Sequence, residues 1–550
     1  MKKFTLLFII MLLGFGLRVY KLDIRPVGFT WDEAALGYNA YSLLKTGRDE
    51  YGKTLPIVLK SFGDYKPGLY AYLAVPTIKF FGLNEFATRL PSAIFGTLMV
   101  VVTYLFVKYL TSNPSPTSQD ASRKLDLGEG GPSRVGEVSL ASAFLMAINP
   151  WAIQFSRGAW EANIALFLTT LAVLCFIKAS RNLTSKTNFY LLSSIFFSLS
   201  IWTYQGAKMF TPMLILSLFV IYRPHIKLLI KPLIILIILV SPILLGLSSQ
   251  SGRLKVFSVF SYTRSRESLP YDYKLSFFHA EIIDQTRGII QRYTNHYSPR
   301  FLFFSGNWTS FRESIPYYGY FHIPEIFTIL IGLAILLRTN NQLTKLLAIW
   351  LIITPIPSAL SRDIVSGVRS LPLVFPLVII SGLGLEKITR HKLLLLLYSS
   401  TLVFFSLYYF DQYYTHAPFF AASEMLYGYK QVFFDIEKEQ DKYQKVIVSN
   451  SQGQPYIFAL FYLKIDPRLA QTQHTLIENP QGDVGRVESL GKYIFKPIYW
   501  PAERGDKSTL FAGDEFSLPE QDLHGIDNLQ RIDEIKYPDG KSAWRVIGLI

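Results

Sequence analysis

The first polar stretch of the chain holds an adjacent acidic pair, Asp32 and Glu33, directly after Thr30 and Trp31. A carboxylate at such a position can act as a general base toward a hydroxyl group. Thr30 and Glu33 also match a capping box, in which the hydroxyl and the carboxylate satisfy the first free backbone donors of a helix. The capping box does not require Asp32, and we therefore expect Asp32 to be the residue available for chemistry.

A helix is predicted to follow this pair. Leu36, Ala40, Leu43 and Leu44 recur at helical spacing, and Gly47 suits the C-terminal end of the helix. The expected result is an amphipathic helix that lies on the membrane surface.

A second polar cluster, Asp64-Tyr65-Lys66-Pro67, precedes an apolar and aromatic segment at residues 68–81. Its lysine could meet a phosphate at the level of the lipid headgroups. The alternative is a turn whose lysine extends its ammonium group to water along an apolar surface.

Three arginines stand beside apolar stretches. Arg89 abuts an early one, Arg157 lies with Trp160 and Glu161 in a connection between two others, and Arg369 precedes a late one. Basic residues are usually enriched on the cytoplasmic side of a membrane, so an arginine on the outer face suggests an anionic ligand. Two alternatives stay open: Arg157 and Glu161 could pair on one helical face, and an isolated interfacial arginine can simply reach water.

The composition excludes several classes of protein. The 550 residues have a net charge of +15 but only 17% charged residues. Many basic residues flank apolar runs instead of forming the single stripe typical of a nucleic-acid-binding protein. One cysteine, Cys175, cannot form an internal disulfide framework or a cysteine-based zinc cluster.

Signatures of soluble cofactors are also missing from the sequence. The eight histidines show no paired metal-ligand spacing. No phosphate-binding loop, dinucleotide fingerprint or nucleophile elbow occurs. No nucleotide or redox cofactor is therefore expected, and an enzyme of this kind would act on a lipid-borne substrate.

Long apolar stretches position these residues. Segment 68–81 contains Pro76 and Lys79 and is predicted to be a juxtamembrane or re-entrant helix. About eleven stretches are predicted to cross a membrane, at residues 4–20, 91–110, 139–154, 163–179, 189–204, 210–222, 232–247, 323–337, 343–360, 371–385 and 393–410.

Basic residues between these stretches set the expected orientation. Lys2, Lys3 and the Lys/Arg clusters at 178–186, 223–231, 338–345 and 387–392 are expected in the cytoplasm. The flexible linker 111–137 is expected on the same side. Three polar pieces then lie outside the membrane: residues 21–67, 248–322 and 411–550.

The last of these pieces changes to mixed α/β character. A strand is predicted at residues 445–449 and a helix at residues 455–463. We therefore expect two domains, a membrane domain over residues 1–410 and a small extracytoplasmic α/β domain over residues 411–550.

Together these features resemble the GT-C superfamily of polytopic glycosyltransferases, and most closely its protein O-mannosyltransferase and aminoarabinose-transferase group (glycosyltransferase family 39-like). The matching elements are Asp32-Glu33, Lys66-Pro67, the Arg89-Leu90-Pro91 segment and the outer insert at residues 248–322. Three departures occur: a lysine replaces histidine at position 66, Gly68 stands where a second proline is frequent, and the tyrosine that commonly follows the late arginine is missing after Arg369.

The resemblance implies a mainly α, GT-C-like membrane fold and a reaction in the plasma membrane. A sugar would pass from a polyprenyl-phosphate carrier to a hydroxyl group of a protein, lipid or polysaccharide, with inversion and without nucleic acid as a partner. Asp32 would be the general base, and Glu33 would position it or help it hold a divalent metal cation. The donor phosphate would be bound by Lys66, Arg89, Arg157 and Arg369, and the substrates by Asp64, Tyr65, Trp160 and Glu161.

The sequence is also compatible with two other classes of function. A lipid or anion transporter, or a flippase, could use the same basic residues but would place charges deep within several spans. A structural or adhesion protein would work through its outer tail, and replacing Asp32 or Lys66 would have no effect.

Overall fold

The computed structural model describes residues 2–112, 131–181, 186–246, 259, 281–339, 341–479 and 484–550. Most of the predicted linker 111–137 and a large part of the predicted outer loop 248–322 therefore lie outside the described residues. The chain forms two compact units. Unit 1 comprises Met1–Tyr20, Ser92–Leu247 and Phe257–Tyr413, and unit 2 comprises Lys21–Pro91, Ser248–Val256 and Tyr414–Ile550.

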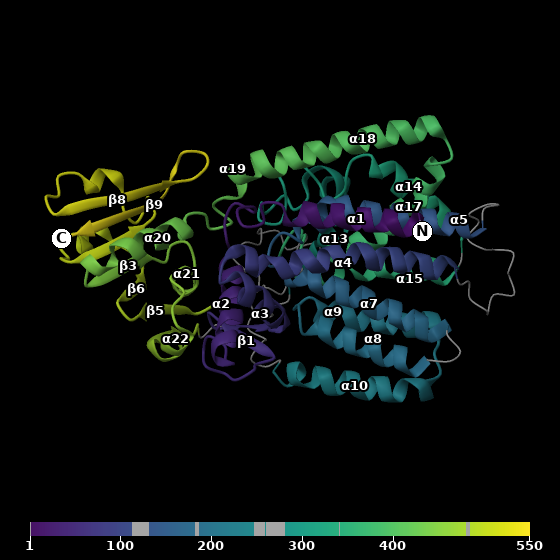
Figure 1. The fold of residues 1–550 in the computed structure, drawn as a ribbon, viewed down its shortest axis with the longest axis horizontal. Coiled ribbons are helices and arrows are strands. Elements are labelled where there is room, and N and C mark those ends of the chain that lie inside the picture. Colours follow the sequence, from purple (N-terminus) through teal and green to yellow (C-terminus); the bar gives the residue numbers. More distant parts are fainter. Residues whose placement is uncertain are drawn as a thin grey trace, which may run out of the picture. The chain divides into compact units, whose positions relative to one another are not determined.

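Unit 1 is a bundle of helices (Figure 1). In chain order these are α1 (Lys2–Val19), most of α4 (Glu85–Ser112), α5 (Gly131–Ile148), α6 (Pro150–Gln154), α7 (Glu161–Arg181), α8 (Lys186–Ile201), α9 (Ala207–Tyr222), α10 (Ile226–Leu245), α13 (Glu281–Asn295), α14 (Glu325–Leu337), α15 (Gln342–Ile353), α16 (Ile356–Ala359), α17 (Val374–Ile388) and α18 (Lys392–Asp411). Each predicted span coincides with one helix or with two helical segments that follow each other in the chain.

Several of these helices are suited to a bilayer, which confirms a polytopic helical protein. Six segments in the described part of the chain are long and apolar enough to cross a membrane: Glu85–Leu110, Glu161–Arg181, Ile226–Leu245, Gln342–Ala359, Leu371–Ile388 and Lys392–Ala421. Because other apolar helices are shorter, the count of eleven spans stays a prediction.

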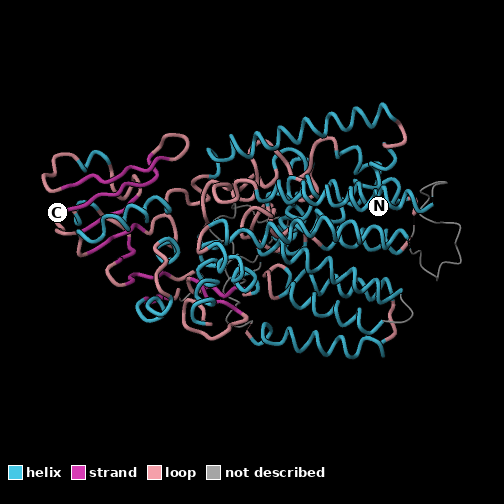
Figure 2. The backbone as a smooth tube through the Cα atoms, in the orientation of Figure 1, coloured by secondary structure: helices cyan, strands magenta, loops and turns pink. Residues whose placement is uncertain are grey.

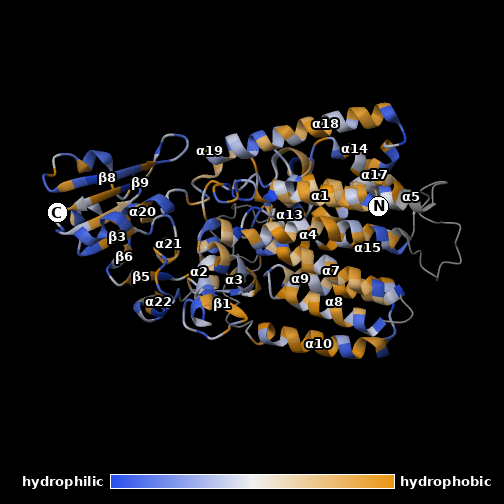
Figure 3. Cartoon of the chain, viewed as in Figure 1, coloured by the Kyte–Doolittle hydropathy of each residue, from blue (hydrophilic) through white to orange (hydrophobic). Residues whose placement is uncertain are grey.

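The exposed faces of two helices show where lipid is expected. Hydrophobic residues predominate along α10 and α18 (Figure 3), and the side chains of Ile237, Ile238, Phe404 and Leu407 are among those largely exposed. Exposed apolar surface of this extent is unfavourable in water and favourable against lipid tails.

The basic residues between helices gather at one end of unit 1. The junctions α7/α8, α9/α10, α14/α15 and α17/α18 lie at the end that also holds the N-terminus (Figure 1). The four charged junctions and the N-terminus therefore share one end of unit 1.

A buried arginine joins α1 to its neighbours in unit 1. Arg18 is fully buried and donates to Ser156 Oγ at 3.2 Å and to the carbonyl oxygens of Gly14, Met146 and Ala147 at 2.9–3.1 Å. A buried charge requires such partners, because an unsatisfied one would be very costly in an apolar environment.

In unit 2, α2 (Trp31–Thr46) is followed by a hairpin of β1 (Val58–Ser61) and β2 (Asp64–Pro67), then by α3 (Leu69–Phe81) and the first turns of α4. Only a turn was predicted before α3, and the short hairpin was missed.

The remainder of unit 2 contains a seven-stranded mixed sheet (Figure 2). The strand order is β4-β5-β6-β3-β7-β9-β8, with β3 parallel to β6 and β7 and the other pairs antiparallel. The strands are β3 (Lys445–Ser449), β4 (His474–Ile477), β5 (Arg486–Leu490), β6 (Tyr493–Lys496), β7 (Thr509–Gly513), β8 (Leu529–Lys536) and β9 (Ser542–Leu549). The predicted strand at 445–449 is confirmed as β3.

Helices of the tail connect this sheet to α2. These are α20 (Tyr429–Glu439), α21 (Pro455–Tyr462) and α22 (Pro467–Gln473), and α21 confirms the helix predicted at 455–463. α21 and α22 pack against α2, where Phe29 and Phe461 have ring centroids 4.8 Å apart and Tyr38 donates to the carbonyl oxygen of Ile465 at 2.9 Å. The tail therefore supports the helix that carries the acidic pair.

Candidate active site

The start of α2 presents the acidic pair. The predicted capping box is present, since Glu33 N donates to Thr30 Oγ1 at 3.3 Å and Thr30 N donates to Glu33 Oε2 at 3.1 Å. At the other end, Gly47 ends the helix in the left-handed conformation, with φ of 69°. Both ends of the helix are thus fixed by local sequence, and the first turn holds Asp32 and Glu33 in defined positions.

The hairpin places Lys66 against Asp32. Phe62 and Gly63 form its turn with positive φ values, and strand alternation directs Asp64 and Lys66 to the same, buried side. The ammonium group of Lys66 forms an ion pair with Asp32 Oδ1. The side chain of Lys66 is 7% exposed and that of Asp32 is 25% exposed, so the carboxylate remains accessible to a reactant.

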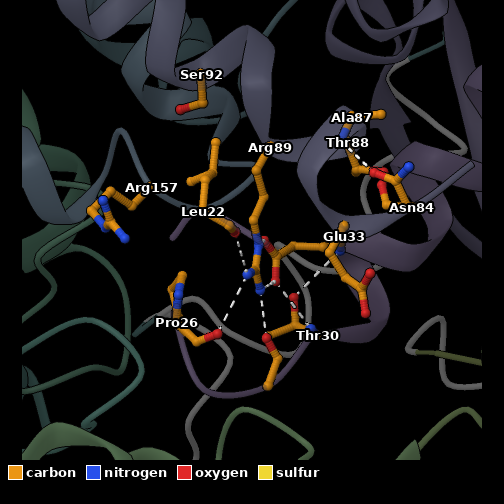
Figure 4. A network of polar contacts seen from close by, with 12 residues as sticks. Leu22, Pro26, Thr30, Glu33, Asn84, Ala87, Thr88, Arg89, Ser92 and Arg157 are labelled. Carbon is orange, nitrogen blue, oxygen red and sulfur yellow. Dashed lines mark hydrogen bonds and ion pairs between the residues drawn. The ribbon is translucent and has the colours of Figure 1, made fainter. Parts of the chain in front are cut away.

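The neighbouring Glu33 pairs with Arg89 (Figure 4). Arg89 Nε lies 2.9 Å from Glu33 Oε1, and Arg89 Nη2 lies 3.2 Å from Glu33 Oε2. The same guanidinium group donates to the carbonyl oxygens of Leu22, Pro26 and Gly28. Arg89 thereby fixes the chain that leads into α2 and orients the first turn of that helix.

This geometry changes the expected role of Arg89. The residue was predicted to contact the donor phosphate, yet its side chain is 0% exposed and bonded to five acceptors within unit 2. Its burial favours a positioning role over direct contact with a phosphate, because a ligand would have to displace a buried, bidentate ion pair. The sequence could not reveal this, since it does not give the depth of a side chain.

A buried carboxyl group near Lys66 was not predicted from the sequence. Glu50 is 0% exposed, and Asn39, Ser61 and Lys66 are among its neighbours. Burial raises the pKa of Glu50 to about 8, against smaller lowering effects of Ser61 and Lys66. Glu50 therefore carries a proton at neutral pH and adds little negative charge beside Lys66.

The other predicted residues of this cluster lie on opposite faces of β2. Asp64 is buried on the face of Lys66, whereas Tyr65 lies on the other face, where the ammonium group of Lys60 is 5.7 Å from its ring centroid. Asp64 accordingly lies on the same face as the Asp32–Lys66 pair, while Tyr65 does not.

The remaining predicted residues belong to unit 1. Arg157 is 0% exposed and donates to Tyr413 Oη at 2.9 Å and to the carbonyl oxygens of Leu17 and Tyr20 at 2.8 and 2.7 Å. Like Arg89, it is better suited to hold the chain than to bind phosphate. Glu161 begins α7, a position where helices favour acidic residues.

Trp160 and Arg369 are more accessible. The ring of Trp160 contacts Phe155 at a centroid distance of 5.0 Å, and the guanidinium group of Arg312 lies 5.2 Å from its centroid. Arg369 pairs with Asp363, and its side chain is 32% exposed. Of the three arginines predicted to bind phosphate, Arg369 has the most exposed side chain.

The acidic pair does not fit a metal centre as it stands. Asp32 accepts from Lys66, and both oxygens of Glu33 accept from Arg89 and Thr30. In the ranges the structure describes, no group of three His, Cys, Asp or Glu side chains is placed to hold a metal ion. Ion pairs and hydrogen bonds therefore already engage one oxygen of Asp32 and both oxygens of Glu33.

Comparisons with known proteins agree with this architecture. The crystal structure of apo ArnT from Cupriavidus metallidurans is 10% identical, covers 98% of this chain and 97% of its own, and gives a TM-score of 0.55. The chain shares the ArnT fold. ArnT from the same organism bound to undecaprenyl phosphate is 11% identical, with the same coverage and a TM-score of 0.51.

The sequence alone gives a shorter match. Residues 8–116 match the family model described as dolichyl-phosphate-mannose-protein mannosyltransferase. No curated protein matches the chain. The ArnT fold and the family match confirm the resemblance inferred from the motifs, and the matched residues include Asp32, Glu33, Lys66 and Arg89.

Proposed function

We propose that this protein is a multi-pass membrane glycosyltransferase that moves a sugar from a polyprenyl phosphate to an acceptor hydroxyl group. The single observation that carries the proposal is the ion pair of Asp32 with Lys66 in a chain of the ArnT fold. ArnT has been crystallised with undecaprenyl phosphate, and the matching family model is described by a dolichyl-phosphate sugar donor. The alternative of a transporter or flippase gains no support from these comparisons.

Asp32 acts as the general base in the proposed reaction. The acceptor hydroxyl proton passes to the carboxylate of Asp32 while the acceptor oxygen forms a bond to the anomeric carbon. The bond between that carbon and the phosphate oxygen breaks, and its electron pair leaves with the polyprenyl phosphate. Attack on the face opposite the leaving phosphate inverts the anomeric centre.

Lys66 neutralises the phosphate that leaves. A phosphate that attracts the ammonium group of Lys66 weakens its hold on Asp32, and the freed carboxylate becomes a stronger acceptor for the hydroxyl proton. A phosphate monoester is already a good leaving group, so charge neutralisation is sufficient and a second acidic residue is not needed. The sequence resemblance adds Arg369 to the phosphate contacts.

Glu33, Arg89 and Arg157 support the reaction indirectly. Glu33 and Arg89 hold the start of α2 and thereby the direction of Asp32. Arg157 holds backbone carbonyl groups within unit 1. We place no step of the reaction on a metal ion, because the carboxylates that would bind it are engaged by Lys66 and Arg89.

The orientation follows from the charged junctions of unit 1. Basic residues at the end that holds the N-terminus favour the cytoplasm for that end. The loop with Asp32 and the tail then lie outside the plasma membrane, where acceptors of the cell envelope are found. Asp64, Trp160 and Glu161 are proposed to contact the sugar or the acceptor.

The test is transfer by the purified protein from a panel of polyprenyl-phosphate sugars, measured as release of polyprenyl phosphate. Asp32→Asn should abolish release while the protein remains folded and in the membrane. Asp527→Asn, at an exposed position of the same unit, is the matched control and should leave release unchanged. Turnover by Asp32→Asn at the rate of the native protein would refute the assigned base.

A further inference from the structure

The backbone that leads into Arg369 is held by a carboxylate from a distant turn of unit 1. Glu313 Oε2 accepts from Gly367 N at 2.7 Å and from Val368 N at 3.2 Å. The same oxygen accepts from Asn307 Nδ2 at 3.0 Å. Hydrogen bonds to an ionised acceptor are the stronger ones, so Glu313 fixes two successive peptide groups immediately before Arg369.

A histidine holds the preceding peptide group. His296 Nε2 accepts from Ser366 N at 3.1 Å and lies 2.8 Å from Ser358 Oγ, while His296 Nδ1 lies 2.7 Å from the carbonyl oxygen of Arg292. This arrangement requires the neutral tautomer with its proton on Nδ1, because a protonated Nε2 could not accept. Burial lowers the pKa of His296 to about 4, which keeps the ring neutral.

Aromatic side chains hold the other side of the same segment. Trp151 Nε1 donates to the carbonyl oxygen of Gly367 at 3.0 Å, and Trp151 stacks on Tyr320 with ring centroids 4.2 Å apart. The hydroxyl of Tyr320 donates to the carbonyl oxygen of Glu313 at 3.0 Å. A Cβ on Gly367 would lie 2.0 Å from that hydroxyl, so the segment has no room to shift toward it.

We infer that Glu313 and His296 form a clamp that positions Arg369 for the donor phosphate. Neither residue touches the phosphate itself, and both act through the backbone of Ser366, Gly367 and Val368. This inference rests on the proposed function, because it takes Arg369 as a phosphate contact. It names two positioning residues that lie more than fifty residues before the arginine in the sequence.

Holding this backbone in place favours the binding of a phosphate by Arg369. Arg369 has a flexible side chain, and a fixed backbone reduces the conformational freedom that binding must remove. Its guanidinium group pairs with Asp363, and its side chain as a whole is 32% exposed. A phosphate that binds there therefore meets an arginine whose backbone is already held in place.

The experiment measures binding of undecaprenyl phosphate to the purified full-length protein in detergent, together with KM and kcat for a polyprenyl-phosphate sugar. Arg369→Ala should weaken lipid binding at least about tenfold, the effect of losing a hydrogen bond to a charged group. Glu313→Ala should weaken it by a similar factor, with a rise in KM that exceeds the change in kcat. The double variant Glu313→Ala/Arg369→Ala should be no worse than Arg369→Ala alone.

Glu313→Gln separates the clamp from a general effect of charge. Its amide oxygen can still accept from Gly367 N and Val368 N, so it should bind the lipid nearly as well as the native protein. Equal losses in Glu313→Ala and Glu313→Gln would overturn the clamp, and so would losses that multiply in the double variant. The same comparison can be made with His296→Ala, alone and combined with Arg369→Ala. The losses of lipid affinity should again not add in the double variant.

Glu325→Gln is the matched control. Glu325 also accepts a backbone N–H group in unit 1, that of His322 at 3.1 Å, but it does not contact the segment before Arg369 in the structure as described. This variant should bind undecaprenyl phosphate with the affinity of the native protein, even if its stability is lower. Failure of the native protein to bind the lipid would refute the proposed function and the clamp together. If the native protein binds the lipid and Glu313→Ala binds it with the same affinity, the clamp alone is refuted.

Discussion

Asp32 and Lys66 form a direct ion pair, although 34 positions separate them in the sequence. The carboxylate comes from the first turn of α2 and the ammonium group from β2 of the following hairpin. The pair unites the two motifs that were singled out independently in the sequence. Within the pair, each group neutralises the charge of the other.

Removal of Lys66 should impair transfer more than it impairs folding. Lys66→Met leaves Asp32 without its partner and the leaving phosphate without a cation, and we expect turnover to fall about 100-fold or more. Lys60→Met, on the partner strand of the same hairpin, is the control because Lys60 pairs with Glu478 at an exposed position. Release of polyprenyl phosphate measures both. Comparable losses in the two variants would show that the hairpin, and not the cation, is what matters.

Breaking the buried pair of Glu33 and Arg89 should chiefly lower stability. Arg89→Met leaves a buried carboxylate unpaired, and the free energy of unfolding should fall by about 3–5 kcal/mol. Arg531→Met breaks the exposed pair with Glu520, which is separated by 2.6 Å, and should cost at most about 1 kcal/mol. Thermal unfolding of the two variants in the same detergent measures the difference, and equal shifts would contradict the structural role of Arg89.

Glu50 should make the protein less stable as the pH rises. Its pKa of about 8 lies above the ordinary value of 4.5, so between these values the unfolded chain loses a proton that the folded chain keeps. Stability then falls with rising pH across this window, by up to about 1.4 kcal/mol per pH unit. Glu50→Gln should flatten the dependence of the unfolding temperature on pH between about 5 and 8. Glu515→Gln, at an exposed position, should leave that dependence as it is in the native protein.

Contact between the tail and α2 can be tested at one glycine. Gly453 has a φ of +103°, and a Cβ there would lie 2.3 Å from Trp31 Cζ3. Gly540 has a φ of +87°, and a Cβ there would have no described atom within 4 Å. Gly540→Ala should therefore cost only backbone strain of about 1 kcal/mol, whereas Gly453→Ala should cost more and reduce transfer. Equal unfolding temperatures for the two variants would argue against a supporting role of the tail.

The sequence predicted the helices well because their signals are local. Eleven apolar stretches, the capping box at Thr30, and the strand and helix at residues 445–463 all depend on neighbouring residues. The hairpin at Asp64 was missed because its strands have only four residues each and its turn uses positive φ at Phe62 as well as Gly63. Such a short strand leaves no periodicity to detect.

The roles of the arginines were harder to predict. Arg89, Arg157 and Arg369 all stand beside apolar stretches, and their sequence context is alike. Burial separates them, and burial depends on contacts with distant residues such as Leu22 and Tyr413. For the same reason nothing in the sequence around Glu313 indicated its contact with Gly367.

The packing of α21 and α22 against α2 has a consequence for biosynthesis. Residues near the beginning of the chain pack against residues near its end, as Phe29 does against Phe461. The segment that carries Asp32 therefore cannot complete its packing while the ribosome is still making the helices in between. Activity should arise only after the whole polypeptide has been synthesised, and an enzyme interrupted before its last hundred or so residues should remain inert.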